Sequence, residues 1–355
     1  MKRYPAFVTG AALTGLVAIA SSATCSREKS PGDEIRVLTD RTEAHLTPIF
    51  SAYEQATHVS IKTVYLDKGL ISRLESRPTE ADVVITRDAD LLEIAKQKTL
   101  LQSHASELIN RAVPAEFRDP DGMYFTDSYR ARVIFYSKDR VRPEELSTYE
   151  ALGDPKWKGR VCIRSGYHDY NLSLFGQMAA VSGTERTRKF LEALAANLAR
   201  APAGDDRAQA RAIFEKKCDV AIANSYYMGV MLSTPEQRDW GLATRVFFPD
   251  QDGGGTFILR SGMALTKATL NVKAATALLE HMVQEDVQAS FANLTFSYPV
   301  NSRQPMPDIN RSLGVGQPGV KEGVFKIHAV RLPDIARQRD TILRMLDEIQ
   351  FDRPR

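Results

Sequence analysis

The stretch EIRVLTDRTEAHLTPIFSAYEQATHVSIKTVY, residues 34–65, indicates the fold class most clearly. It begins with a short apolar run over 34–38, continues with apolar residues at helical spacing over 43–55, and ends with a second short run over 59–65. A strand, a helix and a strand in this order form a βαβ unit, in which the two strands lie parallel in one sheet. We therefore expect an α/β protein whose helices pack on a mixed, mainly parallel sheet.

The same alternation continues along the chain. The sequence ADVVIT at 81–86 reads as a buried strand, and a helix over 88–97 closes a first series of units. Two long extended segments, YRARVIFYS at 129–137 and the run at 256–264, bracket a second series. The second series contains predicted strands at 160–164 and 219–223 and predicted helices at 172–181, 186–199, 206–216 and from 226 onward. Amphipathic helices are expected at 273–285 and 334–349.

The length and the two extended segments predict two lobes. A chain of 355 residues is too long for one hydrophobic core. The extended segments suit a chain that crosses between lobes twice, with the second lobe inserted into the first. We expect an N-terminal lobe of residues 33–129 and 258–300, and a C-terminal lobe of residues 130–257 and 301–352.

The first residues have the parts of an export signal. Lys2 and Arg3 precede an apolar stretch over 7–20 and a group of small residues. We expect 1–24 to be a signal peptide, with lipid attachment at Cys25 as the alternative to a free periplasmic protein. No later run approaches the ~20 apolar residues of a membrane span, so the expected protein is exported and not integral.

Charge and cysteine content narrow the class further. The formal net charge is +3, with acids and bases interspersed, whereas nucleic-acid binding would need a basic face. If Cys25 belongs to the export region, Cys162 and Cys218 remain as a pair in an oxidising compartment. Each lies at a predicted strand shortly before a loop with tyrosines. We predict a disulfide between them, and two buried thiols are the alternative.

Three loops are candidates for the binding site. Ligands of open α/β sheets bind beyond the carboxyl ends of the strands. The loops that follow predicted strands with suitable polar residues are 40–43, 166–171 and 224–227. The last holds the adjacent pair Tyr226 and Tyr227. With Asn224 or Ser225 as N-cap, both tyrosines would lie in the first helical turn and lean toward one cleft.

Clustered phenols indicate a particular ligand chemistry. A phenol has a pKa of ~10 and is a poor ligand until a highly charged, hard cation stabilises the phenolate. Fe(III) prefers anionic oxygen donors, and the unpaired N–H groups at helix N-termini favour negative charge. The alternative for such a pair is ordinary aromatic packing. The sequence therefore predicts a ferric ion, Fe(3+), as the bound species.

Longer stretches carry a specific resemblance. Residues 124–175, with YRARVIFYSKDRVRPEELSTYEALGDPKWKGRVCIRSGYHDYNLSL, and residues 218–229, with CDVAIANSYYMG, resemble the periplasmic ferric ion-binding proteins of bacterial iron(III) ABC importers. The resemblance is closest to the branch that holds iron mostly with tyrosines, and it covers nearly the whole chain after the export signal. It implies a two-lobed periplasmic-binding-protein-like fold and a membrane permease as partner. It also implies a monomer whose lobes close on the ion and open to release it.

The resemblance also implies residue roles. Tyr226 and Tyr227 match the family's tandem iron ligands, and Tyr170 matches the tyrosine supplied from the preceding loop. Where the family often has a His-Tyr pair after the first strand, this chain has Thr42 and Glu43. Glu43 is a candidate fourth oxygen donor, with the role of an ordinary acid in a first helical turn as the alternative.

Family members often complete the iron site with a synergistic anion such as carbonate. Arg130 and Arg132 are alternate residues of one predicted strand and are candidates to clamp such an anion. The alternative is an edge-strand pair or a salt bridge between lobes.

The sequence favours a binding protein over an enzyme, since it lacks a nucleophile elbow, a zinc-hydrolase motif and a paired Cys/His arrangement. Two other functions remain open. The same fold could bind an organic anion or a phosphonate, or the protein could report iron to a membrane partner.

Overall fold

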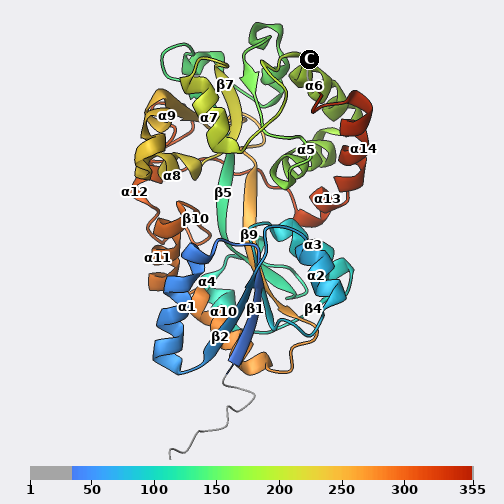
Figure 1. Cartoon of the computed structure of the whole chain (residues 1–355), viewed down its shortest axis with the longest axis vertical. Coiled ribbons are helices and arrows are strands. Elements are labelled where there is room, and N and C mark those ends of the chain that lie inside the picture. Colours follow the sequence, from blue (N-terminus) through green and yellow to red (C-terminus); the bar gives the residue numbers. More distant parts are fainter. Residues whose placement is uncertain (1–33, 354–355) are drawn as a thin grey trace, which may run out of the picture.

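Two lobes joined by two long strands make up the structure. The computed structural model describes residues 34–353. Strands β5 (Tyr124–Ser137) and β9 (Ile258–Thr266) run through the middle of the molecule and connect the lobes (Figure 1). They coincide with the two extended segments that the sequence predicted, and the two-lobed α/β architecture is confirmed. The predicted signal peptide 1–24 and Cys25 lie outside the described residues.

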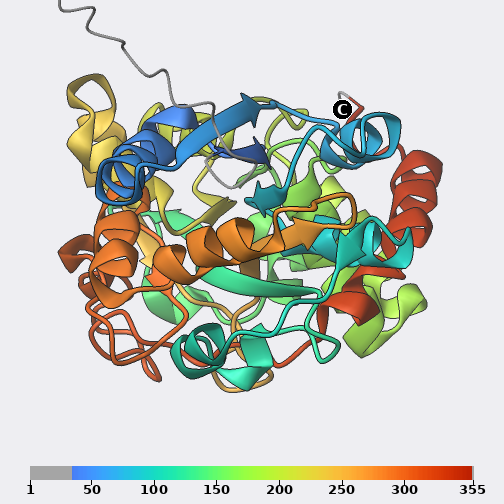
Figure 2. The same cartoon turned by 90° about the horizontal axis from the view of Figure 1, so that it is seen from below.

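The N-terminal lobe, in the lower half of Figure 1, grows from the predicted βαβ unit. Its elements before the first crossover are β1 (Glu34–Thr39), α1 (Glu43–Thr57), β2 (Ser60–Tyr65), α2 (Leu70–Ser76), β3 (Val83–Thr86), α3 (Ala89–Gln97), β4 (Leu101–Gln102), α4 (Glu107–Ala112) and the 3₁₀ turn η1 (Ala115–Phe117). After β9 the chain adds α10 (Val272–Met282), α11 (Glu285–Thr295) and β10 (Tyr298–Pro299). Helices lie on both sides of the β1 and β3 strands (Figures 1 and 2). The strands between them are therefore buried on both faces, as an apolar run such as ADVVIT requires.

The C-terminal lobe lies in the upper half of Figure 1. It contains β6 (Val161–Cys162), α5 (Asp169–Ser182), α6 (Thr184–Ala196), α7 (Asp206–Phe214), β7 (Val220–Asn224), α8 (Tyr227–Ser233), α9 (Arg238–Ala243), β8 (Thr244–Phe247), and the late helices α12 (Asp308–Arg311), α13 (Leu332–Ala336) and α14 (Arg339–Ile349). Short 3₁₀ turns lie at η2 (Pro143–Glu145), η3 (Glu150–Gly153), η4 (Pro155–Trp157) and η5 (Pro235–Gln237). The residue boundaries of the two lobes stay a prediction.

The strands form one mixed sheet in the order β2-β1-β3-β9-β5-β7-β6. β1 pairs in parallel with β2 and β3, whereas β9 and β5 are antiparallel to their neighbours, which places the crossovers at the centre. In the smaller part of the sheet, β6 pairs in parallel with β7. The loops that follow β1, β3 and β7 consequently open toward the region between the lobes, where α/β proteins bind their ligands.

The predicted helix 334–349 is wrong as a single element. The structure breaks it into α13 and α14, separated by Arg337 and Gln338. The two helices have different partners, because α13 packs on α3 and α5 whereas α14 packs on α5 and α6. Tertiary packing thus overrides a continuous helical pattern. None of the helices between residues 34 and 353 combines the length and the apolar character that a membrane span requires.

Candidate functional site

A cavity of about 300 Å³ lies between the lobes and collects residues from all three predicted loops. The N-terminal lobe and the crossovers supply its arginine-rich wall, and the C-terminal lobe supplies its tyrosines. The lining residues are Arg41, Thr42, His45, Arg87, Arg130, Tyr170, Arg207, Tyr226, Tyr227, Val230, Ser261, Thr295 and Ser297. Loops far apart in sequence therefore meet at one site because each follows the end of a strand in the same sheet.

Tyr226 and Tyr227 stand at the N-terminus of α8, as the sequence predicted. Their ring centroids are 4.0 Å apart with 30° between the ring planes, so both rings lie side by side at the cavity. The predicted cap by Asn224 or Ser225 is wrong, because Tyr226 itself occupies the N-cap position. The two polar side chains are engaged by β5 instead: Asn224 Oδ1 accepts from Arg132, and Ser225 Oγ accepts from the Ala131 amide.

Tyr170 lies in the first turn of α5 and is almost fully buried. Its backbone N–H donates to His168 Nδ1 over 3.2 Å, which caps the helix. Three guanidinium carbons lie close to its ring centroid: those of Arg130 at 5.0 Å, Arg164 at 5.1 Å and Arg132 at 5.9 Å. Cations at these distances attract the electron-rich ring face. The three guanidinium groups therefore hold the Tyr170 ring in place beside the cavity.

Burial shifts the pKa values of the other site groups toward their neutral forms. It raises the pKa of Tyr226 well above its usual value, with Tyr170 and Tyr227 adding to the effect. It also raises the pKa of Tyr227 to about 12. The pKa of His168 falls to about 4 because of burial and the nearby Arg164. Near pH 7, Tyr226 and Tyr227 are therefore protonated and His168 is neutral, so a cation must displace phenol protons to bind.

Arg130 is the predicted anion ligand that faces the cavity. Its Nη1 donates to Ser261 Oγ over 3.0 Å and to the Arg87 carbonyl oxygen over 2.5 Å. Its Nη2 is buried without a hydrogen-bond partner and lies 3.9 Å from Asp88 Oδ1. A buried, unsatisfied guanidinium N–H is costly, and an anion in the cavity would satisfy it.

Arg132 points elsewhere, although it is two residues away on the same strand. It is fully buried and donates to Asp206 over 2.7 Å, to Asn224 over 3.1 Å and to Asn171 over 2.6 Å. It is not among the residues that line the cavity. This network joins β5, β7, α5 and α7. Arg132 therefore holds the elements that carry the tyrosines in place from within the lobe.

The N-terminal lobe contributes His45 to the cavity, and Glu43 is not among the lining residues. Glu43, the first residue of α1, is exposed. His45 is two residues further, about 200° around the helix, and half-buried. The sequence analysis considered Thr42 and Glu43 for this role, at the position of the family's His-Tyr pair. The direction in which α1 continues from β1 determines whether Glu43 or His45 faces the cavity.

The sequence reasoning also missed Arg41, Arg87 and Arg207, which line the cavity. Arg87 directly follows the end of β3 and Arg41 lies two residues after the end of β1, and these positions are the signal that could have found them. Arg41 donates to Asp127 over 2.9 Å. Among residues 34–353, no group of three or more His, Cys, Asp or Glu side chains is arranged to hold a metal ion.

The predicted disulfide is confirmed. Cys162, in β6, is bonded to Cys218, two residues before β7, with the Cα atoms 5.9 Å apart. The bond ties together the strands whose following loops carry Tyr170 and Tyr226. It therefore supports the part of the lobe that presents the tyrosines.

Comparisons with known proteins show the family and the fold. Residues 79–318 match the family described as bacterial extracellular solute-binding protein. Iron uptake protein A1 of Synechocystis sp. is 36% identical over 292 residues, which cover 80% of this chain and 81% of the relative. The apo ferric ion-binding protein A of Pasteurella haemolytica has a TM-score of 0.82 at 35% identity, covering 90% of this chain and 99% of that one. A Trichodesmium protein solved with iron and citrate ligands has a TM-score of 0.81 at 30% identity, with 90% and 99% of the two chains covered.

Proposed function

Because the chain belongs to the bacterial extracellular solute-binding protein family, we propose that it captures ferric iron between its lobes and delivers it to the permease of an ABC importer. The observation that carries the proposal is the meeting of Tyr170, Tyr226 and Tyr227 at one cavity between the lobes. The names of the relatives, an iron uptake protein and a ferric ion-binding protein, support the same cargo.

The proposed ligands are the oxygens of Tyr170, Tyr226 and Tyr227. Three phenolates balance the charge of Fe(III), and oxygen anions are the donors that this hard ion prefers. Arg130, with its unsatisfied Nη2, is the proposed contact for a small synergistic anion such as carbonate. The arginine-rich wall of the N-terminal lobe would then face the anion, and the tyrosine wall would face the metal.

The proposed transport cycle uses the two crossovers as hinges. Opening and closing of lobes around a ligand is an established motion of two-lobed proteins, with a few residues absorbing the change. We propose an exported, extracytoplasmic monomer that closes on iron and docks on the permease. Opening of the lobes or protonation of the phenolates would release the ion.

Visible spectroscopy tests the cargo. Iron-free protein is titrated with Fe(III) presented by a weak carrier, with bicarbonate present, beside the double variant Tyr226→Phe/Tyr227→Phe. The matched control is Tyr167→Phe, since the Tyr167 hydroxyl donates to Asp347 and this residue is not among those lining the cavity. A phenolate bound to Fe(III) gives a broad charge-transfer band, so we expect a band that saturates at one iron per chain in the wild type and in the control, and is lost in the double variant.

A colourless protein that ignores iron would overturn the proposal. An organic anion or phosphonate held by Arg41, Arg87 and Arg130 would then be the leading ligand class. A band that survives unchanged in the double variant would show that Tyr226 and Tyr227 are not the phenolates that produce it.

A further inference from the structure

A second cavity, of about 310 Å³, lies behind the crossover strands. Its lining includes Arg260 of β9, whereas the next residue, Ser261, lines the tyrosine cavity. Consecutive residues of a strand point to opposite faces, so the two cavities lie on opposite sides of β9. The remaining lining comes from 115–120, from Tyr124 and Thr126 of β5, and from 329–333, the segment that leads into α13. This rear cavity thus has walls from two distant parts of the chain.

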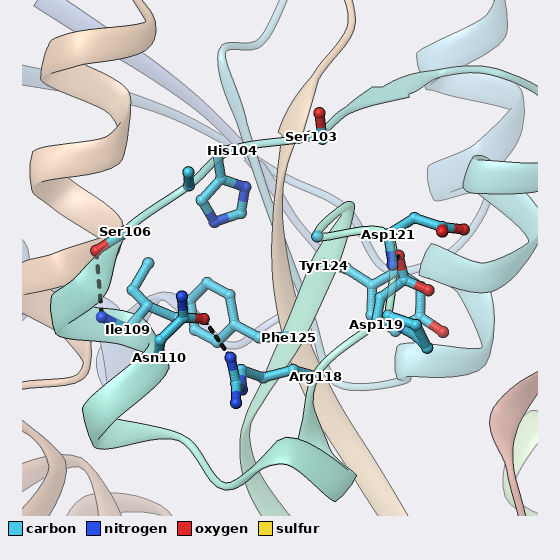
Figure 3. Close-up of a pocket in the computed structure, with 13 residues that line it drawn as sticks. Ser103, His104, Ser106, Ile109, Asn110, Arg118, Asp119, Asp121, Tyr124 and Phe125 are labelled. Carbon is cyan, nitrogen blue, oxygen red and sulfur yellow. Dashed lines mark hydrogen bonds between the residues drawn. The ribbon is translucent and has the colours of Figure 1, made fainter.

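The rear cavity is distinct from the polar cavity beside it, which Figure 3 shows. That polar cavity, about 410 Å³ in volume, shares Arg118, Asp119 and Tyr124 with the rear cavity. Its main charged groups already have partners, because Lys96 contacts both Asp119 and Asp121, and Arg118 donates to Asn110 (Figure 3). The turn at 118–120 therefore separates the two cavities. Its charged side chains, Arg118 and Asp119, are bonded to partners at the polar cavity.

Arg260 is a cation without a carboxylate at the rear cavity. Its guanidinium donates only to backbone carbonyl oxygens, those of Glu116 at 3.2 Å and Val330 at 3.3 Å, and lies 5.3 Å from the ring centroid of Phe117. Among the described residues no carboxylate oxygen lies within 4.0 Å of its guanidinium, although Asp90 and Glu116 interact with it electrostatically at longer range. Burial lowers its pKa, although it stays a cation at neutral pH. A partly buried guanidinium beside apolar side chains lacks the anion that would best satisfy it.

Thr126 provides an independent second observation. It lines the same cavity, is 1% exposed, and its Oγ1 has no hydrogen-bond partner. Thr126 pairs with Gly262 across β5 and β9, and Arg260 is two residues before Gly262 on the same face of β9. Both side chains line one cavity, where a carboxylate can accept from the guanidinium and from the threonine hydroxyl.

We propose that the rear cavity binds a small amphipathic monocarboxylate. Its carboxylate contacts Arg260 and Thr126, and its hydrocarbon part packs on Phe117, Val330 and Leu332. The volume is at the lower end of the range for small-molecule sites, which suits a short chain or a single ring. The nearby acids are engaged or in solvent, because Asp119 is bonded to Lys96, Asp90 accepts a hydrogen bond from Ser173, and Glu116 is exposed.

The site also couples to cargo, and this part rests on the proposed function. The segment 329–333 leads into α13, which packs on α3 of the N-terminal lobe and on α5 of the C-terminal lobe. Lobe closure changes the distance between such walls, so a ligand that spans them binds the open and closed forms unequally. The coupling must be reciprocal, with iron changing carboxylate affinity by the same factor as the carboxylate changes iron affinity.

Calorimetry with octanoate on the iron-free full-length protein tests the site without reference to iron. We expect one site with a Kd of about 1 mM or tighter, which a ligand of about ten non-hydrogen atoms can reach. Arg260→Gln and Thr126→Val should weaken binding by at least tenfold and by about threefold, respectively. The control Arg245→Gln, at an exposed arginine of β8, should leave it unchanged. Octanol, which lacks the carboxylate, should bind the wild type at least tenfold more weakly.

Equal binding of octanoate and octanol, or no binding of octanoate, would overturn the site even if Arg260→Gln failed to fold. A repeat with iron-loaded protein should change the octanoate Kd by at least threefold. An unchanged octanoate Kd would overturn the coupling and leave the site itself standing. If the iron titration fails, the calorimetry on iron-free protein still tests the site completely.

Discussion

Tyr226 and Tyr227 are held where a phenolate is costly without a cation. Burial raises the pKa of both, and for Tyr227 to about 12. The guanidinium groups of Arg130 and Arg164 lie over the ring of Tyr170 at the same cavity. Tyr226 and Tyr227 therefore stay protonated across the ordinary pH range, and binding of a trivalent cation is what ionises them.

Iron binding should consequently release protons. Both phenols of the tandem pair are protonated at any pH below their raised pKa values, and the proposed bound state holds both as phenolates. Each proton released makes the affinity for Fe(III) rise about tenfold per pH unit. We expect the logarithm of the association constant, corrected for the carrier's own titration, to rise with a slope of at least 2 between pH 6 and 8. Affinity is therefore lost as the pH falls.

Competition titrations against citrate at several pH values measure that slope. Tyr226→Phe should lower it by about one unit, because one ionising phenol is gone. A slope near zero in the wild type would mean that iron does not bind as a complex of the tandem phenolates.

A second residue prediction separates Glu43 from His45. Glu43 is exposed, whereas His45 lines the cavity and has a pKa lowered by burial and by Arg41. We expect Glu43→Gln to keep the iron dissociation constant within about threefold of the wild type, whereas His45→Ala raises it by about tenfold, equivalent to ~1.4 kcal/mol. Parallel Fe(III) titrations of the two variants, followed by the visible band, measure both dissociation constants. A large loss in Glu43→Gln would show that closure brings that carboxylate to the ion.

At the scale of elements, the disulfide between Cys162 and Cys218 should stabilise the tyrosine-bearing strands. The two cysteines are 56 residues apart, and closing a loop of that length restricts the unfolded chain by about 4 kcal/mol in the chain-entropy model. We expect Cys162→Ala/Cys218→Ala to lower the free energy of unfolding by about 2–4 kcal/mol. Urea unfolding with and without a reductant measures the difference.

The variant itself provides the control for that measurement. A reductant should destabilise the wild type and leave the double alanine variant unchanged. If reduction leaves the wild-type transition in place, the bond contributes nothing to stability under those conditions.

Elements governed by local pattern were predictable, and those governed by packing were not. The units around 34–65 and 81–97, both crossovers and the tyrosine pair followed from apolar periodicity and from the rule on strand ends. The division of the helix 334–349 depends on two different packing partners, which no local pattern encodes. The predicted cap of α8 was wrong for a similar reason, because Asn224 and Ser225, which would have capped the helix, are hydrogen-bonded to β5.

The candidate site shows the same division. Tyr170, Tyr226 and Arg130 meet at one cavity as their positions after strands or on a crossover indicated. Alternation along β5 predicted one face for Arg130 and Arg132, and both guanidinium groups lie near the ring of Tyr170. Only Arg130 lines the cavity, because Arg132 is bonded to the buried Asp206 within the lobe, a partner that no local pattern indicates.

For the whole molecule, the contacts between lobes decide how closure stabilises the bound ion. Ser173 of α5 donates to the buried Asp90 of α3, a hydrogen bond that links the C-terminal lobe to the N-terminal lobe. Burial raises the pKa of Asp90, and the bond from Ser173 opposes that rise. Hydrogen bonds to charged groups contribute about 1.5–3 kcal/mol, so this contact is strong enough to affect the balance between open and closed forms.

Removing this contact should weaken iron binding without touching the metal ligands. In Ser173→Ala the closed form loses a bond that the open form replaces with water, so we expect the iron dissociation constant to rise by about tenfold. The position of the visible band should stay the same because the phenolates are unchanged. Small-angle scattering should show a larger radius of gyration for the variant at subsaturating iron. Ser182→Ala, at the exposed end of the same helix, is the matched control. A variant that binds iron as tightly as the wild type would show that the bond between Ser173 and Asp90 persists in both forms, and that closure is set by other contacts.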